Sequence, residues 1–295
     1  MDRTNYIIRQ LGRTKNKRYE LYCVTRIIHL LNNLDVKFVT QQYVSRPDGF
    51  ALMDLYFPQI QLHVEVDEEG HKSQVEADKM RESDIVAVTD KQIEHIDASK
   101  NISITEINDR IDEIVAKINA KIVELKDDFI PWDIKTEFNP QTYIDLGYIK
   151  LSDNVAFKTI KDVCNCFGHN YKGWQRAEAS HPDKDTIIWC PKLFLDGQKQ
   201  EGEWDNTISA DGQTITEKNS ASKEKAEEHV NIHINNKEKA HKRIVFIKIK
   251  DNLGVILYRF RGLYKLNLMK SNVTHGLIWE RAKTEIPTYK HLKVR

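Results

Sequence analysis

Residues 54–67 read DLYFPQIQLHVEVD, and this stretch decides the fold of the amino-terminal half. Pro58-Gln59 predicts a turn between two strands, Ala51–Phe57 and Gln61–Asp67. In the second strand apolar and polar residues alternate, and successive side chains of a strand point to opposite faces. One face is therefore expected to join the core, and the other to project three polar side chains, those of His63, Glu65 and Asp67.

The segments around this hairpin predict an α/β unit. An amphipathic helix over Lys17–Asn32 is followed by another strand, Val36–Val44, and by the turn-forming residues Arg46-Pro47-Asp48-Gly49. After Gly70 the sequence is polar and helical through Glu82. Residues 85–88 are a short apolar run, which is typical of a buried strand.

A long helix is predicted from Ser103 to Asp127, because isoleucines recur at spacings of three and four. This apolar seam is expected to face the core or to brace two domains, and a coiled-coil-like contact with a second subunit is the other interpretation. Pro131-Trp132 and Pro140 then interrupt the helical pattern. We therefore predict a first domain over residues 1–130, a linker over 131–140 and a second domain over 141–295.

The second half is typical of a small antiparallel barrel or strongly bent sheet. Three strands are predicted there, Arg243–Lys250, Gly254–Phe260 and Gly262–Asn267. Glu217–Lys242 is highly charged and predicts an exposed helix or a mobile insertion. Within it His229 and His233 lie four residues apart, so they can share a helix face, and the surrounding Lys and Glu residues favour solvent exposure.

Length and composition exclude several classes of protein. The 295 residues predict two domains, and the apolar runs fall short of the ~20 residues that a membrane span needs. The first residues lack the layout of a signal peptide, so we expect a cytoplasmic protein without a membrane partner. The four cysteines (Cys23, Cys164, Cys166, Cys190) do not form a disulfide framework, and the spacing of Cys164, Cys166 and His169 is not that of a zinc site, so buried cysteines are expected.

The net charge of +1 hides a strong division along the chain. Residues 1–50 carry a net charge of +5, residues 51–150 carry −11, residues 151–250 carry +1 and residues 251–295 carry +6. Basic ends around an acidic middle suit a protein that holds a polyanion and gathers carboxylates, which can surround a metal. The alternative is that these charges are solvated faces.

The strands predict a cluster of carboxylates. Two adjacent strands can bring Asp54 beside Glu65 and Asp67, which gives an oxygen site suited to Mg²⁺ or another divalent cation such as Mn²⁺. Such a site can hydrolyse phosphodiesters. His71 and Lys72 are close enough in sequence to reach it, and Glu20 of the first helix can supply a further carboxylate. The alternative is that these acids are merely exposed to solvent.

The order of these residues resembles the PD-(D/E)xK nuclease core in its Vsr-type form, the form found in mismatch-repair nucleases. It departs from the plain motif because Asp67 stands where a lysine is usual. Lys72 lies beyond that position, so the general base and the group that neutralises charge stay unassigned. His71 is our first choice for the base.

A second candidate site lies at Trp204 and Asn206. A base flipped out of a duplex needs an aromatic face for stacking and polar groups for its edge, and this pair provides both. Core packing by Trp204 and a turn at Asn206 are the alternative. Basic residues of the following strands are expected to hold the DNA phosphates, namely Arg243, Lys248, Lys250, Arg259, Arg261 and Lys265.

Eight segments in the same order resemble the AbaSI family of modification-dependent restriction endonucleases. They are Phe38–Val44, Arg46–Gly49, Asp54–Gln59, Glu65–Glu68, Asn165–His169, Pro191–Leu193, Trp204–Ser209 and Tyr258–Gly262. The resemblance runs nearly end to end. It implies an α/β, Vsr-like PD-(D/E)xK nuclease domain and an α+β, SRA-like (PUA-like) domain.

The same resemblance implies an activity. An enzyme of this kind flips 5-hydroxymethylcytosine, or its glucosylated form, in duplex DNA and cuts both strands at a fixed distance. Two subunits act together, with Mg²⁺, in defence against phage. The opposing hypothesis is a reader of modified DNA that does not cleave it and whose amino-terminal domain serves dimerisation.

The resemblance also implies roles for individual residues. The metal and catalytic carboxylates are Asp54, Glu65 and Asp67, with His71 near them and Glu20 as an auxiliary acid. The base pocket holds Trp204 and Asn206, with Trp189 and Tyr171 as candidates for its opposite wall.

Overall fold

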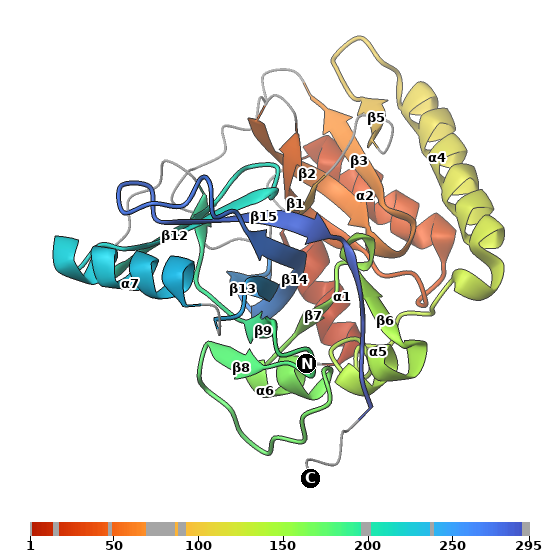
Figure 1. The fold of residues 1–295 in the computed structure, drawn as a ribbon. Helices are drawn as coiled ribbons and strands as arrows, with labels where there is room; N and C mark the ends of the chain where they lie inside the picture. The colour runs from red at the N-terminus through yellow and green to blue at the C-terminus, as the bar shows by residue number, and fades with distance from the viewer. Residues whose placement is uncertain are drawn as a thin grey trace. The chain divides into compact units, whose positions relative to one another are not determined.

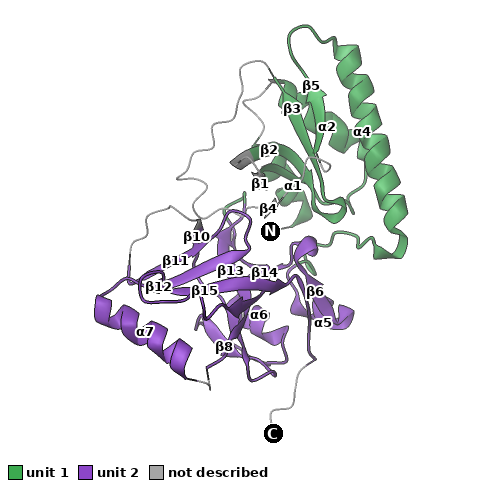
Figure 2. Ribbon diagram, turned by 45° about the horizontal axis from the view of Figure 1, so that its top comes forward, with its two compact units in different colours: residues 1–137, 252–254 green, residues 138–251, 255–295 purple. Residues whose placement is uncertain are grey.

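The computed structural model describes residues 2–13, 18–46, 49–68, 86–87, 93–195, 202–236 and 239–290. The chain divides into two compact units (Figure 2). Unit 1 comprises residues 1–137 and 252–254, and unit 2 comprises residues 138–251 and 255–295. Within the described ranges no helix has the length and apolar character that crossing a membrane requires.

Unit 1 is built on a five-stranded mixed sheet in the order β4-β1-β2-β3-β5, whose strands are labelled in Figure 2 and, except for β4, in Figure 1. β1, β2 and β3 are antiparallel neighbours, whereas β4 runs parallel to β1 and β5 runs parallel to β3. The turn predicted at Pro58 is the short 3-10 helix η1 (Pro58–Ile60). The strands are β1 (Val39–Arg46), β2 (Gly49–Phe57), β3 (Leu62–Asp67), β4 (Val86–Ala87) and β5 (Ile93–Asp97).

Helices pack on one face of this sheet. They are α1 (Arg3–Leu11), α2 (Arg18–Leu31) and α4 (Ile104–Leu125), and the 3-10 turn η3 (Lys126–Asp128) follows α4. Ser103 begins α4 with a capping box, in which its side chain and that of Glu106 each bond the other residue's backbone N–H. The predicted isoleucine seam of α4 is buried against α2 and the apolar side of β2, β3 and β5, so it is core.

Unit 2 contains a nine-stranded sheet in the order β10-β11-β12-β15-β14-β13-β9-β8, with β7 paired to β14, and a separate pair of β6 and β16. Its strands are β6 (Tyr148–Lys150), β7 (Ala156–Phe157), β8 (Glu178–Ser180), β9 (Thr186–Trp189), β10 (Phe194–Leu195), β11 (Trp204–Ile208), β12 (Thr214–Asn219), β13 (Lys242–Lys250), β14 (Ile256–Leu266), β15 (Leu277–Lys283) and β16 (Glu285–Pro287). Its helical elements are α5 (Pro140–Leu146), η4 (Leu151–Asp153), α6 (Ile160–Asn165) and α7 (Lys223–Asn235).

The strand break predicted near Gly262 does not occur. β14 is one continuous strand, and its pairing with β13 shifts register at this point. Gly262 has a φ of 116°, and an added Cβ would lie 2.7 Å from the carbonyl oxygen of Lys283. The glycine therefore permits an irregularity inside the strand and does not end it.

Two elements of unit 1 were not predicted, α1 and β5. Both are short, and the five residues of β5 contain two isoleucines among charged residues. The charged segment of unit 2 is a helix, α7, which begins at the N-cap Ser222. Glu217, predicted to open that exposed segment, is instead a buried residue of β12.

Candidate functional site

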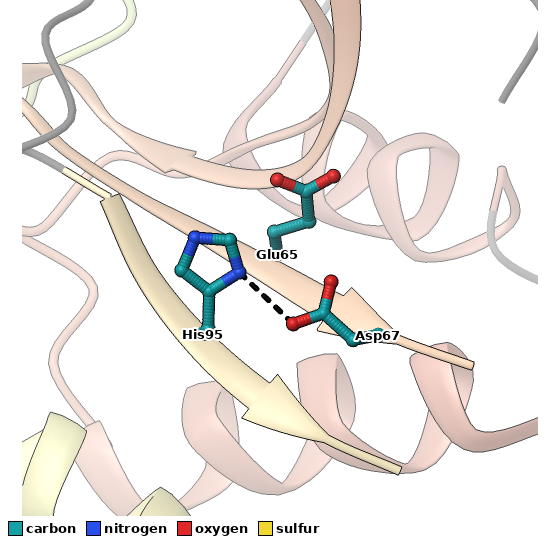
Figure 3. A group of neighbouring side chains, drawn as sticks. All are labelled: Glu65, Asp67 and His95. Carbon is teal, nitrogen blue, oxygen red and sulfur yellow. Dashed lines mark hydrogen bonds and ion pairs between the residues drawn. The ribbon is translucent and has the colours of Figure 1, made fainter. Parts of the chain in front are cut away.

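The face of the unit 1 sheet opposite the helices carries polar side chains from β3 and β5 (Figure 3). The apolar residues of β3 point into the helix-covered core, so Glu65 and Asp67 point to the other face. The parallel pairing of β3 with β5 places His95 beside Glu65. Local strand alternation and one pairing of distant segments thus build this group.

Glu65, Asp67 and His95 form a compact cluster. One ligand atom from each lies within 4.8 Å of the other two, and His95 Nδ1 lies 2.9 Å from Asp67 Oδ2. Glu65 is half-buried, whereas Asp67 and His95 are exposed. Two accessible carboxylates in this arrangement fit a divalent cation such as Mg²⁺ or Mn²⁺. His95 is then placed to hold the Asp67 carboxylate by a hydrogen bond.

Asp54 lies on the same sheet face but is not the third member of this group among the described residues. Its side chain is 6% exposed, and Oδ2 accepts a 2.8 Å hydrogen bond from the backbone N–H of Val66. Its Oδ1 accepts from Gln41 Nε2 at 3.2 Å. The expected trio of Asp54, Glu65 and Asp67 stays a prediction: Asp54 is fixed against the backbone of β3, and His95 lies beside Glu65 and Asp67.

Gln41 joins Asp54 to Glu20. The same Nε2 atom donates to Glu20 Oε1 at 2.6 Å, and Glu20 is 2% exposed. The backbone of Gln41 has a φ of 54°, a left-handed conformation that costs about 1–2 kcal/mol for a residue with a Cβ. Strain of this kind clusters at functional sites. The structure thus puts Glu20 near Asp54, as expected for an auxiliary acid, and its role in catalysis stays a prediction.

Glu68 fixes the start of α2, the helix that carries Glu20. Its Oε1 accepts hydrogen bonds from the backbone N–H groups of Tyr19 at 2.8 Å and Glu20 at 3.0 Å. A carboxylate at a helix N-terminus satisfies free N–H groups and interacts favourably with the helix dipole. The residue after Asp67 in the sequence therefore holds the helix that supplies Glu20.

Two residues of this site were missed in the sequence, His95 and Gln41. The stretch Ile93-Glu94-His95-Ile96-Asp97 does not alternate, because its two isoleucines lie three residues apart, and its pairing with β3 joins residues about thirty positions apart. Gln41 has no local signal, because its φ and its two acceptors depend on the fold. His71 and Lys72 lie outside the described residues, and their roles stay predictions.

In unit 2, Trp204 and Asn206 lie on β11, two residues apart and on one face of the strand. The Trp204 side chain is 41% exposed, whereas Asn206 is buried and its Oδ1 accepts a hydrogen bond from the backbone N–H of Lys218 at 3.2 Å. The exposed indole is available for stacking. The alternative in which Trp204 packs in the core is wrong.

Arg243 was expected to contact phosphate, and the structure contradicts this. The residue is 1% exposed, its guanidinium carbon lies 4.2 Å from the ring centroid of Trp189 and 4.1 Å from that of Trp279, and Nη1 lies 2.8 Å from Glu217 Oε2. Arg243 is thus an internal cation between two indoles. The other predicted phosphate contacts differ in accessibility: Lys248, Lys250 and Lys265 are exposed, and Arg259 and Arg261 are half-buried.

Trp189 and Tyr171, the candidates for the wall facing Trp204, both pack against other aromatic residues. Trp189 is buried in the core cluster around Trp279. Tyr171 is stacked between His169 and Trp174, with 4.4 Å between centroids on each side, against a different core cluster. The role of Trp189 and Tyr171 in the base pocket stays a prediction.

The four cysteines are buried and free, as expected. Burial raises the pKa of Cys164 to about 12. Burial also raises the pKa of Cys23 to about 12, and the nearby carboxylates of Glu68 and Asp54 add to the effect. The thiols are therefore protonated at neutral pH and do not act as nucleophiles.

Comparison with known proteins defines the class of this molecule. Residues 4–119 match the family described as "Restriction endonuclease PvuRts1 I-like, N-terminal", and residues 142–288 match "SET and RING associated domain". A domain of each kind in one chain defines a restriction endonuclease with an SRA domain, which confirms the expected fold class. No curated protein matches the chain.

A solved structure identifies the family more closely. The chain is similar to "The 5-Hydroxymethylcytosine-Specific Restriction Enzyme AbaSI", with 45% sequence identity, a TM-score of 0.87 and a match that covers 98% of each chain. The chain therefore belongs to the AbaSI family of modification-dependent restriction endonucleases.

Proposed function

We propose that this protein recognises duplex DNA containing 5-hydroxymethylcytosine, or its glucosylated form, and makes a double-strand cut at a fixed distance from the modified base. The observation that carries this proposal is the similarity over nearly the whole chain to a restriction enzyme specific for 5-hydroxymethylcytosine. We assign DNA cleavage to the amino-terminal domain and base recognition to the carboxy-terminal domain, and we expect a homodimer that serves in defence against phage.

In the cleavage site, Glu65 and Asp67 would hold a divalent cation, with Mg²⁺ as the expected ion. His95 keeps the Asp67 carboxylate in place through the 2.9 Å contact at Nδ1. Asp54 fixes the intervening backbone by accepting the Val66 N–H. A cation held there supplies positive charge to the scissile phosphate. His71 remains our candidate for the base that orients or deprotonates the attacking water.

In the recognition site, Trp204 would stack on the flipped base and Asn206 would contact its polar edge. Stacking needs an accessible aromatic face, which the half-exposed indole provides. The exposed Lys248 and Lys265 would neutralise phosphates without reading sequence. Arg259 and Arg261 stay candidates for the same role.

The test is a digest of four otherwise identical duplexes that carry cytosine, 5-methylcytosine, 5-hydroxymethylcytosine or glucosylated 5-hydroxymethylcytosine. Each is incubated with Mg²⁺ and, as a control, with EDTA. We expect metal-dependent fragments, with ends at a constant distance from the modified base, from the two hydroxymethylated duplexes alone. Cutting of all four would contradict the recognition site. Selective retardation of modified DNA without cutting would contradict the cleavage site and favour the non-cleaving reader.

A further inference from the structure

Helix α7 is fixed to the strand that carries the candidate base-stacking residue. It follows β12 directly and begins at the N-cap Ser222. Lys225 Nζ lies 3.4 Å from Glu203 Oε1, one residue before β11. One helical turn later, His229 contacts the Trp204 ring. Ala226 and Val230 on the same side of α7 are buried, so this helix face lies against β11 and β12.

The contact between His229 and Trp204 has an edge-to-face geometry. The ring centroids lie 4.9 Å apart and the planes make an angle of 82°. Aromatic pairs favour this arrangement because the positive edge of one ring meets the negative face of the other. His229, expected in solvent, has a side chain only 14% exposed. The imidazole therefore limits the orientations that the half-exposed indole can adopt.

A buried charged group lies beside His229. Its Nε2 lies 3.6 Å from Glu217 Oε1, within ion-pair distance, and this atom has no hydrogen-bond partner among the described residues. The other oxygen of Glu217 accepts from Trp279 Nε1 at 3.0 Å and lies 2.8 Å from Arg243 Nη1. Glu217 is thus fixed from the core side, and it presents one oxygen to His229.

We propose that His229 is a positioning residue for base recognition: its ring packs edge-to-face on Trp204 and sets the orientation of the indole, through which α7 tunes discrimination between modified and unmodified cytosine. This inference rests on the proposed stacking role of Trp204 and gives the charged segment around α7 a place in that role. His229 acts through Trp204 and does not itself contact the base.

The test is a double-mutant cycle on DNA binding, measured by fluorescence polarisation in EDTA so that no cleavage occurs. The duplexes carry 5-hydroxymethylcytosine or cytosine at one position. Trp204→Ala should raise the Kd for the modified duplex by about five- to 150-fold, the range for losing a stacked base. His229→Ala should raise it by about two- to tenfold, the range for losing an aromatic pair. Neither change should alter the Kd for the unmodified duplex by as much.

The decisive variant combines both changes. If His229 acts through Trp204, then His229→Ala adds no further loss in the Trp204→Ala background. A further loss of the same size there, or no loss in the native background, would overturn the proposal. His229→Phe keeps a ring against the indole and should retain most of the preference, whereas His229→Gln keeps a polar group near Glu217 and should not.

Controls separate this inference from the stacking hypothesis beneath it. His275→Ala removes an exposed histidine of the same unit and should leave both Kd values unchanged. Thermal unfolding of every variant checks that α7 stays folded. If Trp204→Ala weakens binding to both duplexes equally, the stacking role itself fails. If Trp204→Ala is selective and His229→Ala is not, only the positioning role fails.

Discussion

Each unit places a histidine beside a carboxylate, and the two pairs differ in their exposure to solvent and in the charges around them. In unit 1, Asp67 and His95 are exposed on an open sheet face. In unit 2, Glu217 is buried and a guanidinium of the same chain, that of Arg243, lies 2.8 Å away. One group has its negative charge accessible from outside, and the other has it neutralised from within.

The difference shows how burial decides the use of a carboxylate. Burial by itself raises the pKa of Glu217, but Arg243 and then His229 more than offset this and lower it to about 2. The charge of Glu217 is therefore permanent at neutral pH and is committed to internal partners. The unit 1 carboxylates, exposed Asp67 and half-buried Glu65, are far less desolvated and can take up a cation from solution.

The largest effect should come from removing the internal cation. Arg243→Ala would leave Glu217 buried without its main partner, and breaking such a pair lowers the free energy of unfolding by about 3–5 kcal/mol. Urea unfolding measures this loss. The matched control is Lys248→Ala, an exposed cation of the same strand, which should change stability by less than about 0.5 kcal/mol. Equal losses of unfolding free energy in the two variants would contradict the inference that Glu217 depends on an internal cation.

The next largest effect should be the loss of catalysis when the carboxylate cluster of unit 1 is disrupted. Glu65→Ala should slow single-turnover cleavage at least about 100-fold, because charge stabilisation in the reacting state is lost. Its free energy of unfolding should change by no more than about 0.5 kcal/mol, in contrast to Arg243→Ala. A variant that cuts normally would remove Glu65 from the site.

Asp54→Ala tests the inner carboxylate of the same face. We expect it to abolish cutting and to leave DNA binding intact, which a gel-shift assay with modified DNA measures in parallel. Asp54→Asn retains an oxygen that can accept the Val66 N–H, so comparison of the two variants separates charge from backbone support. Retained cutting in both would contradict a catalytic role for Asp54.

Acid should destabilise unit 2 by protonating one buried carboxyl, that of Glu217. The folded pKa of Glu217 is about 2 and its ordinary value is 4.5, so its contribution to stability is complete above pH 4.5 and is lost as the pH falls toward 2. The loss is about 3 kcal/mol. Glu217→Gln should lack this component, so the stability difference between native protein and variant should shrink over that window. A constant difference would contradict the assignment.

The smallest effect should come from His95, which supports Asp67. His95→Ala should raise the Mg²⁺ concentration for half-maximal cleavage by about tenfold, the lower range for losing a partner of a metal ligand. Cleavage at saturating Mg²⁺ should fall much less than in Glu65→Ala. An unchanged Mg²⁺ requirement would make His95 a bystander.

Local alternation made much of unit 1 predictable. The polar side of β3 follows from Leu62, Val64 and Val66 alone, and the α4 seam follows from helical spacing. His95 could not be placed in the same way, because it reaches the site through parallel pairing of distant segments. The burial of Asp54 also depends on non-local partners, namely Gln41 and the Val66 N–H.

In unit 2 the strand pattern contained a signal that was not used. Arg243 has the same parity as Val245, Ile247 and Ile249, so alternation places it on an apolar face of β13. Its buried partner could not be found in this way, because Glu217 is on another strand and within a segment whose composition indicates solvent. The Lys and Glu residues of α7 correctly indicated an exposed side of this helix, but His229 lies on its buried side.

The N-terminal cap that Glu68 gives to α2 links hydrogen–deuterium exchange at the start of this helix to the end of β3. Glu68, the residue after Asp67, accepts both hydrogen bonds. The amide protons of Tyr19 and Glu20 are therefore protected by the chain segment that follows β3. Their hydrogen–deuterium exchange rates therefore depend on how firmly that segment is held. An ion that tightens Asp67 should slow exchange at these two amides, which makes occupancy visible without any nucleic acid present.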